Sequence, residues 1–420
     1  MVDQRRIDDQ HWVDAATAAR HLGIAVRSLY AYVSRGQVRS VPGDHGRPRR
    51  YALVDLERLR IRRDARAGHG AVAAGALRFG EPVLDSAITA ITAHGPAYRG
   101  RLATELAANA TPFENAAELL WSGYLPDARV AWPRAKIPYG PLARLLGPEP
   151  RAPLEVMPLI LQLAALADPA RGDLRTDAGI ACGRRIIPLL AATLGVNARF
   201  AAAAITRAIG APSVAGVAAR ALGLADELAP LVDRVFVLLA DHELNASSFT
   251  ARVAASTDAD PYACVAAALA TLSGPRHGTA CEPIARFAAR VGAPEAAGAE
   301  VRALRKRGEL PPGFGHPLYP DGDPRARAIL DAVTRRSLPR LARTLLAIAD
   351  ATDAAPNVDL ALAVLCAALG VAPAAGSGLF AVARAAGWLA HALEQRATGQ
   401  LLRPRARYTG PQVRSATSAP

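Results

Sequence analysis

Apolar and polar positions follow a helical period over most of this 420-residue chain. From about residue 80 to 400 the pattern is interrupted mainly by Gly and Pro, and alternating strand patterns are few. One helix start has the sequence of a capping box, with Thr111 as the cap, Pro112 at the first helical position and Glu114 three residues after the cap. Hydrophobic residues make up 51% of the chain, so we predict an all-α protein with a large core.

The first 64 residues have a different pattern. The stretch "VDAATAARHLG" predicts a short helix that begins after Asp14 and stops at Gly23. The stretch "AVRSLYAYVSRG" predicts a second helix, and "QVRSVPGDHGRPRRYAL" predicts two short strands around a Pro/Gly loop. A third helix follows in "VDLERLRIRRDAR". This order is that of a small winged helix-turn-helix domain, and residues 1–64 resemble the MerR-like DNA-binding domains.

The charge distribution favours a polyanionic partner for this module. The chain carries 50 Lys/Arg and 37 Asp/Glu, a net charge of +13, and residues 1–80 hold 15 of the basic and 8 of the acidic residues. The resemblance implies that the second helix enters the major groove of DNA and that the basic wing meets phosphates. The residues expected to face DNA are Arg27, Ser28, Tyr30, Tyr32, Arg47, Arg49 and Arg50. The alternative is a helical module for packing or dimerisation, with a solvated basic face.

Residues 65–80 are interpreted as a Gly/Ala-rich linker to the helical region. The start of the chain has no apolar segment of the kind found in signal peptides, and no uncharged run approaches the ~20 residues that span a bilayer. The cysteines are widely spaced and form no C-x-x-C pair, which argues against a zinc knuckle or a disulfide framework. We therefore expect a cytoplasmic protein without a membrane partner.

Three of the nine histidines have unusual surroundings. His242 lies in "LADHELNASSFTARVAAST", His277 in "LSGPRHGTACEP" and His316 in "PPGFGHPLYPDGDPRARAIL", the last two beside glycines. Their closeness along the chain predicts one converging site. No metal is expected there, because no H-E-x-x-H spacing is present.

Two further residues have more than one interpretation. Asp359 heads the apolar helix pattern "NVDLALAVLCAALG", where partial burial suits a general base, but an acid at that position also serves as a helix N-cap. Cys281 follows His277 by four residues and is the candidate for a nucleophilic Cys–His pair. The sequence pattern leaves both questions open.

Six motifs in a fixed order make the region from about residue 82 to 410 similar to citrate synthase. They are "AYRGRLATELAANATPFENAAELLWSGYLP", "DHELNASSFTARVAAST", "GPRHG", "PPGFGHPLYPDGDPRA", "NVD" and "LFAVARAAGWLAHALEQR" with the "LLRPRARY" that follows it. The resemblance implies an all-helical subunit with a large domain at 81–273 and 366–420, a mobile small domain at 274–365, and a homodimer with shared active sites. It also implies condensation of oxaloacetate with acetyl-CoA, which is a co-substrate and not a permanently bound cofactor, and then hydrolysis of citryl-CoA to citrate and CoA.

The resemblance assigns roles to individual residues. Asp359 matches the family's base, His277 the histidine that hydrogen-bonds the thioester oxygen, and His316 the histidine that polarises the ketone and protonates the new alkoxide. The other matches bind oxaloacetate, a dianion that needs cations with fork geometry. They are His242, Phe380, Arg325, Arg384 and Arg403, the last of which the family supplies from the partner subunit.

Three loops depart from the family pattern. Pro317, Pro320 and Asp321 stand where the family often has basic residues for the CoA phosphates. "GTAC" follows His277 in place of "GGAN", and "LALA" follows Asp359 in place of "FYSG", which should raise the pKa of the base by desolvation. Three alternatives therefore stay open: a 2-methylcitrate synthase, a citryl-CoA lyase, and a DNA-binding regulator with a synthase-like sensor domain. The intact set of charged groups favours an active enzyme.

Overall fold

The structure is a computed structural model in which contacts divide the chain into two units, Met1–Asp85 and Ser86–Pro420. The residues that the structure describes are 12–35, 37–43, 48–53, 55, 56, 59, 84–134, 146, 151–197, 201–278, 280–406 and 409–410. The linker predicted at 65–80 lies outside them.

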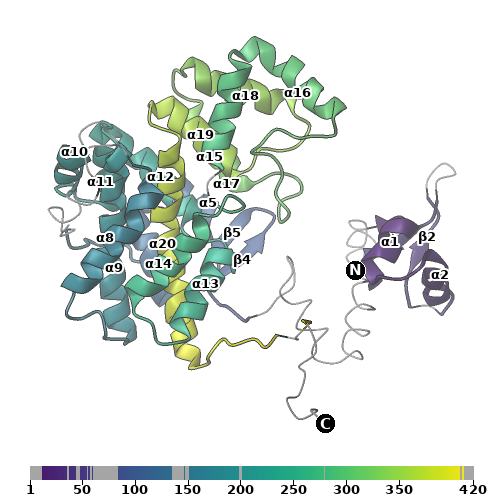
Figure 1. The fold of residues 1–420 in the computed structure, drawn as a ribbon, viewed down its shortest axis with the longest axis horizontal. Coiled ribbons are helices and arrows are strands. Elements are labelled where there is room, and N and C mark those ends of the chain that lie inside the picture. Colours follow the sequence, from purple (N-terminus) through teal and green to yellow (C-terminus); the bar gives the residue numbers. More distant parts are fainter. Residues whose placement is uncertain are drawn as a thin grey trace, which may run out of the picture. The chain divides into compact units, whose positions relative to one another are not determined.

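The first unit combines two helices with a small antiparallel sheet (Figure 1). Helix α1 (Ala15–Leu22) begins where Asp14 Oδ1 accepts the amide of Thr17 at 2.7 Å, and it ends at Gly23 with a φ of 61°, which glycine adopts without strain. Helix α2 (Val26–Ser34) follows after a short turn. The strands pair in the order β1 (Trp12–Val13), β3 (Arg50–Ala52) and β2 (Ser40–Val41).

A small core joins these helices to the sheet. Its buried apolar residues are Ala18, Leu22, Leu29, Val38, Tyr51 and Leu56. The order of elements matches the helix, turn, helix and strand pair predicted from the sequence. Most of the third predicted helix, and Arg47, lie outside the described residues, and the assignment to a MerR-like domain stays a prediction.

The second unit is mainly helical, as predicted. Its helices are α5 (Ala103–Ala108), α6 (Phe113–Ser122), α8 (Pro153–Ala167), α9 (Thr176–Ala192), α10 (Ala201–Ala208), α11 (Val214–Ala221), α12 (Ala229–Leu239), α13 (Ala246–Ala255), α14 (Pro261–Leu272), α15 (Cys281–Val291), α16 (Ala297–Lys306), α17 (Pro324–Val333), α18 (Arg340–Ala351), α19 (Val358–Leu369) and α20 (Ala374–Thr398). Short 3-10 turns are η2 (Thr193–Asn197), η3 (Asp226–Leu228) and η4 (Pro294–Ala296). Near its start lies an antiparallel sheet of β4 (Thr89–Thr92), β5 (Gly95–Tyr98) and β6 (Arg101–Leu102).

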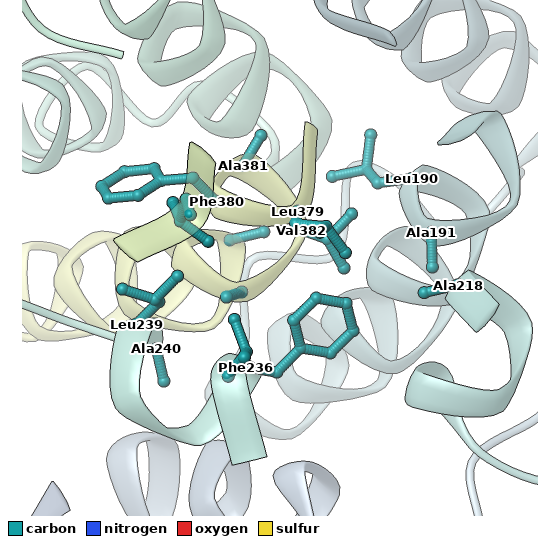
Figure 2. Packing of buried hydrophobic residues seen from close by; sticks show 14 of the residues in the cluster. Leu190, Ala191, Ala218, Phe236, Leu239, Ala240, Leu379, Phe380, Ala381 and Val382 are labelled. Carbon is teal, nitrogen blue, oxygen red and sulfur yellow. The ribbon is translucent and has the colours of Figure 1, made fainter. Parts of the chain in front are cut away.

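Helix α20 is the central helix of this unit, and it contacts α6, α8, α9, α12, α13 and α14 (Figure 1). Every residue from 375 to 393 is buried, which requires packing partners on all sides of the helix. In Figure 2, Leu379 and Val382 of α20 lie between Phe236 of α12 and Leu190 of α9. The apolar core therefore holds α20 rigidly, and with it any functional side chain that the helix carries.

Helices α15, α18 and α19 pack against one another, α16 packs against α18, and α17 joins the group through α19 (Figure 1). The group covers residues 281–369, close to the small domain predicted at 274–365. The domain boundaries themselves stay a prediction.

The predicted capping box at the start of α6 is wrong. The N-cap residue is Pro112 and not Thr111, and no side chain caps the helix. The buried Glu114 carboxylate instead accepts the amide of Val214 at 2.8 Å, at the start of α11. Its hydrogen bond therefore serves tertiary packing and not its own helix.

One helix in the described part of the chain, Thr176–Gly195, is long and apolar enough to cross a membrane, but 72% of its apolar window is buried inside the structure. Helices α19 and α20 are together also long and apolar enough to cross a membrane, although the chain bends by 118° between them. Buried core helices meet the same criteria, because a helix surrounded by protein is apolar on all sides.

Candidate active site

A pairing between two loops joins distant parts of the sequence. Gly315 N donates to Ala355 O at 2.9 Å, and Asn357 N donates to Gly313 O at 3.0 Å. Gly313 has a φ of 97°, and a Cβ atom there would approach Leu360 to 3.0 Å, so the close pairing requires glycine. The pairing places the histidine of the Gly/Pro loop beside the start of α19.

Asp359 is the second residue of α19, and its carboxyl group does not cap the helix. The cap is Asn357, whose Oδ1 accepts the amides of Asp359 and Leu360 at 3.0 and 3.3 Å. The N-cap interpretation of Asp359 is therefore wrong. Burial raises the pKa of the carboxyl group to about 6, against the opposing effect of Arg325, and this is the direction expected from its apolar surroundings.

A turn holds His316 and fixes its tautomer. Tyr319 N donates to His316 O at 3.0 Å, with Pro317 at the second position of the turn, where its fixed φ is favourable. The amide of Leu318 donates to His316 Nδ1 at 3.1 Å, so the proton of the neutral ring lies on Nε2. Burial and the nearby Arg325 lower the pKa of the ring, which keeps it neutral at pH 7.

Arg325 is buried at the start of α17, where it pairs with the residue that caps the helix. Asp323 Oδ1 accepts both the amide and Nε of Arg325 at 3.0 Å, and Oδ2 accepts Nη2 at 2.7 Å. The ring of Tyr319 lies over the guanidinium, with 5.6 Å between the ring centroid and the guanidinium carbon. A bidentate pair of this kind fixes the direction in which the guanidinium points.

His242 lies in the turn after α12 and contacts the same loop. Its Nε2 is 2.9 Å from the hydroxyl oxygen of Tyr319, and its ring meets the His316 ring edge-on, with 5.3 Å between the centroids. Burial, followed by the charges of Arg325 and Arg384, lowers the pKa of His242 well below its usual value. The ring is therefore neutral at pH 7.

His277 precedes α15 and is held by a serine from α13. His277 Nε2 lies 2.9 Å from Ser247 Oγ, which also accepts the indole N–H of Trp388 at 3.0 Å. Burial and the charge of Arg384 lower the pKa of His277 to about 4. A neutral imidazole suits a hydrogen-bond donor to a thioester oxygen.

Arg384 and Phe380 lie one turn apart on α20. Arg384 Nε donates to Leu239 O at 2.9 Å, and its guanidinium carbon lies 4.5 Å from the centroid of the Phe380 ring. Among the described residues Nη2 is buried without a hydrogen-bond partner, and burial lowers the pKa of the group to about 10. A buried cation with an unused donor favours an anionic ligand.

Seven of the eight predicted site residues are linked to one another by direct contacts or by the charges of Arg325 and Arg384. This cluster consists of His242, His277, His316, Arg325, Asp359, Phe380 and Arg384. The eighth, Arg403, is exposed in the segment after α20, and no contact between it and the cluster is found in the described part of the chain.

The nucleophilic interpretation of Cys281 is wrong. The thiol is buried, and burial raises its pKa well above the usual value, whereas a nucleophilic cysteine needs a lowered pKa. Three residues that hold the cluster were not predicted from the sequence: Ser247, Tyr319 and Asp323. The D-P-R sequence before α17 was the available signal for Asp323, since an acid before Pro at a helix start is a common cap.

The cluster defines a site for acid–base chemistry on an anionic substrate, because it combines a carboxyl group of raised pKa, neutral histidines and an arginine with an unused donor. Residues 78–405 match the family model "Citrate synthase, C-terminal domain". Because this match covers most of the sequence, the chain belongs to the citrate synthase family.

Individual relatives agree with this assignment. The chain is 39% identical to "Citrate synthase 2" of Bacillus subtilis over 187 residues, which are 43% of this chain and 50% of that protein. It is 31% identical to a 2-methylcitrate synthase of Mycobacterium tuberculosis over 346 residues, 76% of this chain and 85% of that protein. The fold is similar to that of Thermoplasma acidophilum citrate synthase in complex with carboxymethyl coenzyme A and oxaloacetate, with a TM-score of 0.69, 22% identity, and 81% and 97% of the two chains covered. The chain spans about half the length of the first of these relatives.

Proposed function

We propose that the protein is a cytoplasmic citrate synthase, which condenses acetyl-CoA with oxaloacetate and hydrolyses citryl-CoA to citrate and CoA. The observation that carries this proposal is the half-buried Asp359 carboxyl group, which does not cap its helix and whose pKa responds to Arg325, the same charge that acts on His316 and Arg384. Acetyl-CoA acts as a co-substrate in this proposal, and no permanently bound cofactor is needed.

Each group has a chemical task that its surroundings suit. The Asp359 carboxylate removes an α-proton from acetyl-CoA, and the neutral His277 donates a hydrogen bond to the enolate oxygen. The new carbon nucleophile attacks the ketone of oxaloacetate, while the Nε2 proton of His316 polarises the ketone oxygen and passes to the alkoxide. Water then hydrolyses the thioester and releases CoA.

Oxaloacetate would be held by the arginines and His242. Arg384 has a buried, unused donor for one carboxylate, and the pairing of Arg325 with Asp323 orients a second guanidinium. Phe380 covers Arg384 and excludes water from it. The complex of the Thermoplasma acidophilum relative with oxaloacetate and a CoA compound supports these two substrates.

We further propose a homodimer in which Arg403 completes the partner's site. Helix α8 supports this, because it presents Leu159 and Leu166, which are 41% and 77% exposed, on the same face as the exposed Gln162. A second copy of the chain would cover this apolar face. Movement of the small domain at 274–365 against the large domain would exclude water during the reaction.

Propionyl-CoA is a second candidate for the acyl-CoA substrate, since the 2-methylcitrate synthase of Mycobacterium tuberculosis aligns over 85% of its length. Thiol release with oxaloacetate and either acetyl-CoA or propionyl-CoA tests both. We expect a higher kcat/KM with acetyl-CoA; a preference for propionyl-CoA would favour the 2-methylcitrate reaction. A protein that only cleaves citryl-CoA would be a lyase. A protein that is inert with acetyl-CoA, propionyl-CoA and citryl-CoA alike would support a sensor role.

A second proposed function is DNA binding by the first unit, supported by four exposed side chains on α2 and the wing. These are Arg27, Tyr30, Arg49 and Arg50, whereas Ser28 and Tyr32 are half-buried.

Binding of a labelled DNA duplex at several salt concentrations tests the DNA-binding proposal. Each lost phosphate contact makes the negative slope of log K against log salt less steep by about 0.9, so Arg49→Ala with Arg50→Ala on the wing should make it less steep by about 2. Arg335→Ala, which removes an exposed arginine of the second unit, is the matched control. An unchanged slope in the double variant would contradict DNA binding through these residues.

A further inference from the structure

The side chain of Tyr319 touches three of the predicted site residues at once. Its hydroxyl lies 2.9 Å from His242 Nε2, its ring lies beside that of His316 at 5.0 Å and 36°, and the Arg325 guanidinium lies over its face. Only 3% of the tyrosine is exposed. A residue in this position governs how several substrate-binding groups are arranged.

The local sequence explains why the tyrosine reaches this place. Residues 316–319 form a turn closed by the bond from Tyr319 N to His316 O, so the first and last side chains of the turn lie close together. A second turn follows, in which Gly322 N donates to Tyr319 O at 3.1 Å. The two turns leave the Tyr319 backbone little freedom.

The chemistry of the contact with His242 determines which group donates. Burial raises the pKa of the Tyr319 hydroxyl to about 12, so it keeps its proton at any working pH. A buried hydroxyl proton needs an acceptor, and His242 Nε2 is the acceptor found for it among the described residues. Because Nε2 accepts, the proton of the neutral His242 ring must lie on Nδ1.

The ring of Tyr319 has a separate effect on Arg325. Asp323 holds Nε and Nη2 of the guanidinium, and the tyrosine covers one of its faces. A carboxylate can then approach only along the remaining edge or face. Such a constraint favours one orientation of a bound oxo acid.

From these contacts we propose that Tyr319 is a positioning residue of the oxo acid site, which fixes the tautomer of His242 and the approach to Arg325. The proposal rests on the proposed function for its substrate, but its structural core, the tautomer of His242, does not depend on turnover.

Nitrogen-15 NMR of the histidine-labelled full-length protein tests the tautomer. The His242 signal is identified by its loss in His242→Gln. In the wild type we expect a protonated Nδ1 and an unprotonated Nε2, and in Tyr319→Phe a shift of the proton toward Nε2. The same tautomer in wild type and Tyr319→Phe would overturn the proposal, whether or not the protein turns over oxaloacetate.

Steady-state kinetics test the effect on the substrate. Tyr319→Phe should raise the KM for oxaloacetate about tenfold, the usual effect of one lost buried hydrogen bond, and leave the KM for acetyl-CoA unchanged. Tyr319→Leu, which also uncovers Arg325, should raise it further. Tyr124→Phe, at a tyrosine that is 63% exposed, is the control. An equal change in both KM values, or an unchanged KM for oxaloacetate, would show a merely structural role and overturn the proposal. A wild type without turnover would instead refute the proposed function and leave the NMR result valid.

Discussion

The hydroxyl oxygen of Ser247 lies 2.9 Å from His277 Nε2, so the direction of the hydroxyl proton decides which imidazole nitrogen carries the ring proton. In the structure the hydroxyl donates to Asn245 Oδ1 at 2.7 Å, an arrangement that puts the ring proton of His277 on Nε2. A hydroxyl group has one proton, so it donates either to Asn245 or to His277. Only donation to His277 leaves the ring proton on Nδ1, where it can hydrogen-bond the oxygen of a thioester.

Replacing Ser247 with alanine should therefore slow the reaction more than it weakens substrate binding. We expect kcat to fall about tenfold in Ser247→Ala, because His277 loses the partner that selects its tautomer, and the KM for oxaloacetate to change little. Steady-state kinetics measure both. Ser273→Ala, at an exposed serine that ends α14, is the matched control. An unchanged kcat in Ser247→Ala would contradict this role.

The pH dependence of the reaction should report the ionisation of Asp359. The base must be deprotonated, and burial raises its pKa to about 6, so kcat/KM should fall about tenfold per pH unit below pH 6 and level off above it. His277, with a pKa of about 4, stays neutral through this range and adds no second step above pH 5. Rate profiles between pH 5 and 8 measure this. A rate that stays constant from pH 7 down to pH 5 would contradict the assignment of Asp359 as the base.

Two buried arginines should respond in opposite ways to the same substitution. Arg384 has a buried donor without a partner, so Arg384→Met should raise the melting temperature while it raises the KM for oxaloacetate about 100-fold. Arg252 is paired with His391, Gln395 and Glu394, so Arg252→Met should destabilise the fold by about 3 kcal/mol. Thermal unfolding and kinetics compare the two variants. A lower melting temperature in Arg384→Met would contradict a destabilising, unpartnered Nη2 donor at this site.

A buried carboxyl group outside the site should make the stability depend on pH. Burial and the charge of Glu114 raise the pKa of Asp233 to about 7, from 3.8 in the unfolded chain. The folded state therefore holds this proton more tightly, and the stabilisation is complete below pH 4 and lost as the pH rises to 7.

Asp233→Asn, which cannot ionise, should raise the melting temperature relative to wild type at pH 8 and change it less at pH 5. The expected gain at pH 8 is about 2–4 kcal/mol in the free energy of unfolding. Asp331→Asn, at an exposed position on α17, is the control. An effect of equal size at both pH values would refute the raised pKa.

Features that depend on neighbouring residues could be predicted from the sequence, whereas features that depend on distant contacts could not. The helical period and the end signals at Asp14 and Gly23 depend on neighbouring residues, and the structure has both helix ends where they were predicted. Glu114 had the right spacing for a capping box, but its carboxylate bonds to Val214, 100 residues away, and no local pattern contains that contact. The cap of α19 could be Asn357 or Asp359 from the sequence, and in the structure the side chain of Asn357 caps the helix.

The candidate site shows the same division. The motifs predicted the residues that carry charge and protons, whereas Tyr319 and Ser247 act through contacts with residues 77 and 30 positions away. Side chains that orient others have no chemistry of their own to mark them in a sequence. In the proposed homodimer the place of Arg403 depends on a second chain, which neither the sequence nor a single subunit contains.

The most direct test of the whole account is the release of CoA thiol from acetyl-CoA and oxaloacetate, measured with wild type beside Asp359→Asn. If Asp359 is the base, the wild type releases thiol and the variant, which keeps the shape of the side chain, loses about 10²–10⁴-fold or more of kcat. A binding measurement with oxaloacetate alone should show that the variant still binds the oxo acid. A wild type that is inert with both acetyl-CoA and propionyl-CoA, or an Asp359→Asn variant as fast as the wild type, would contradict the proposed function.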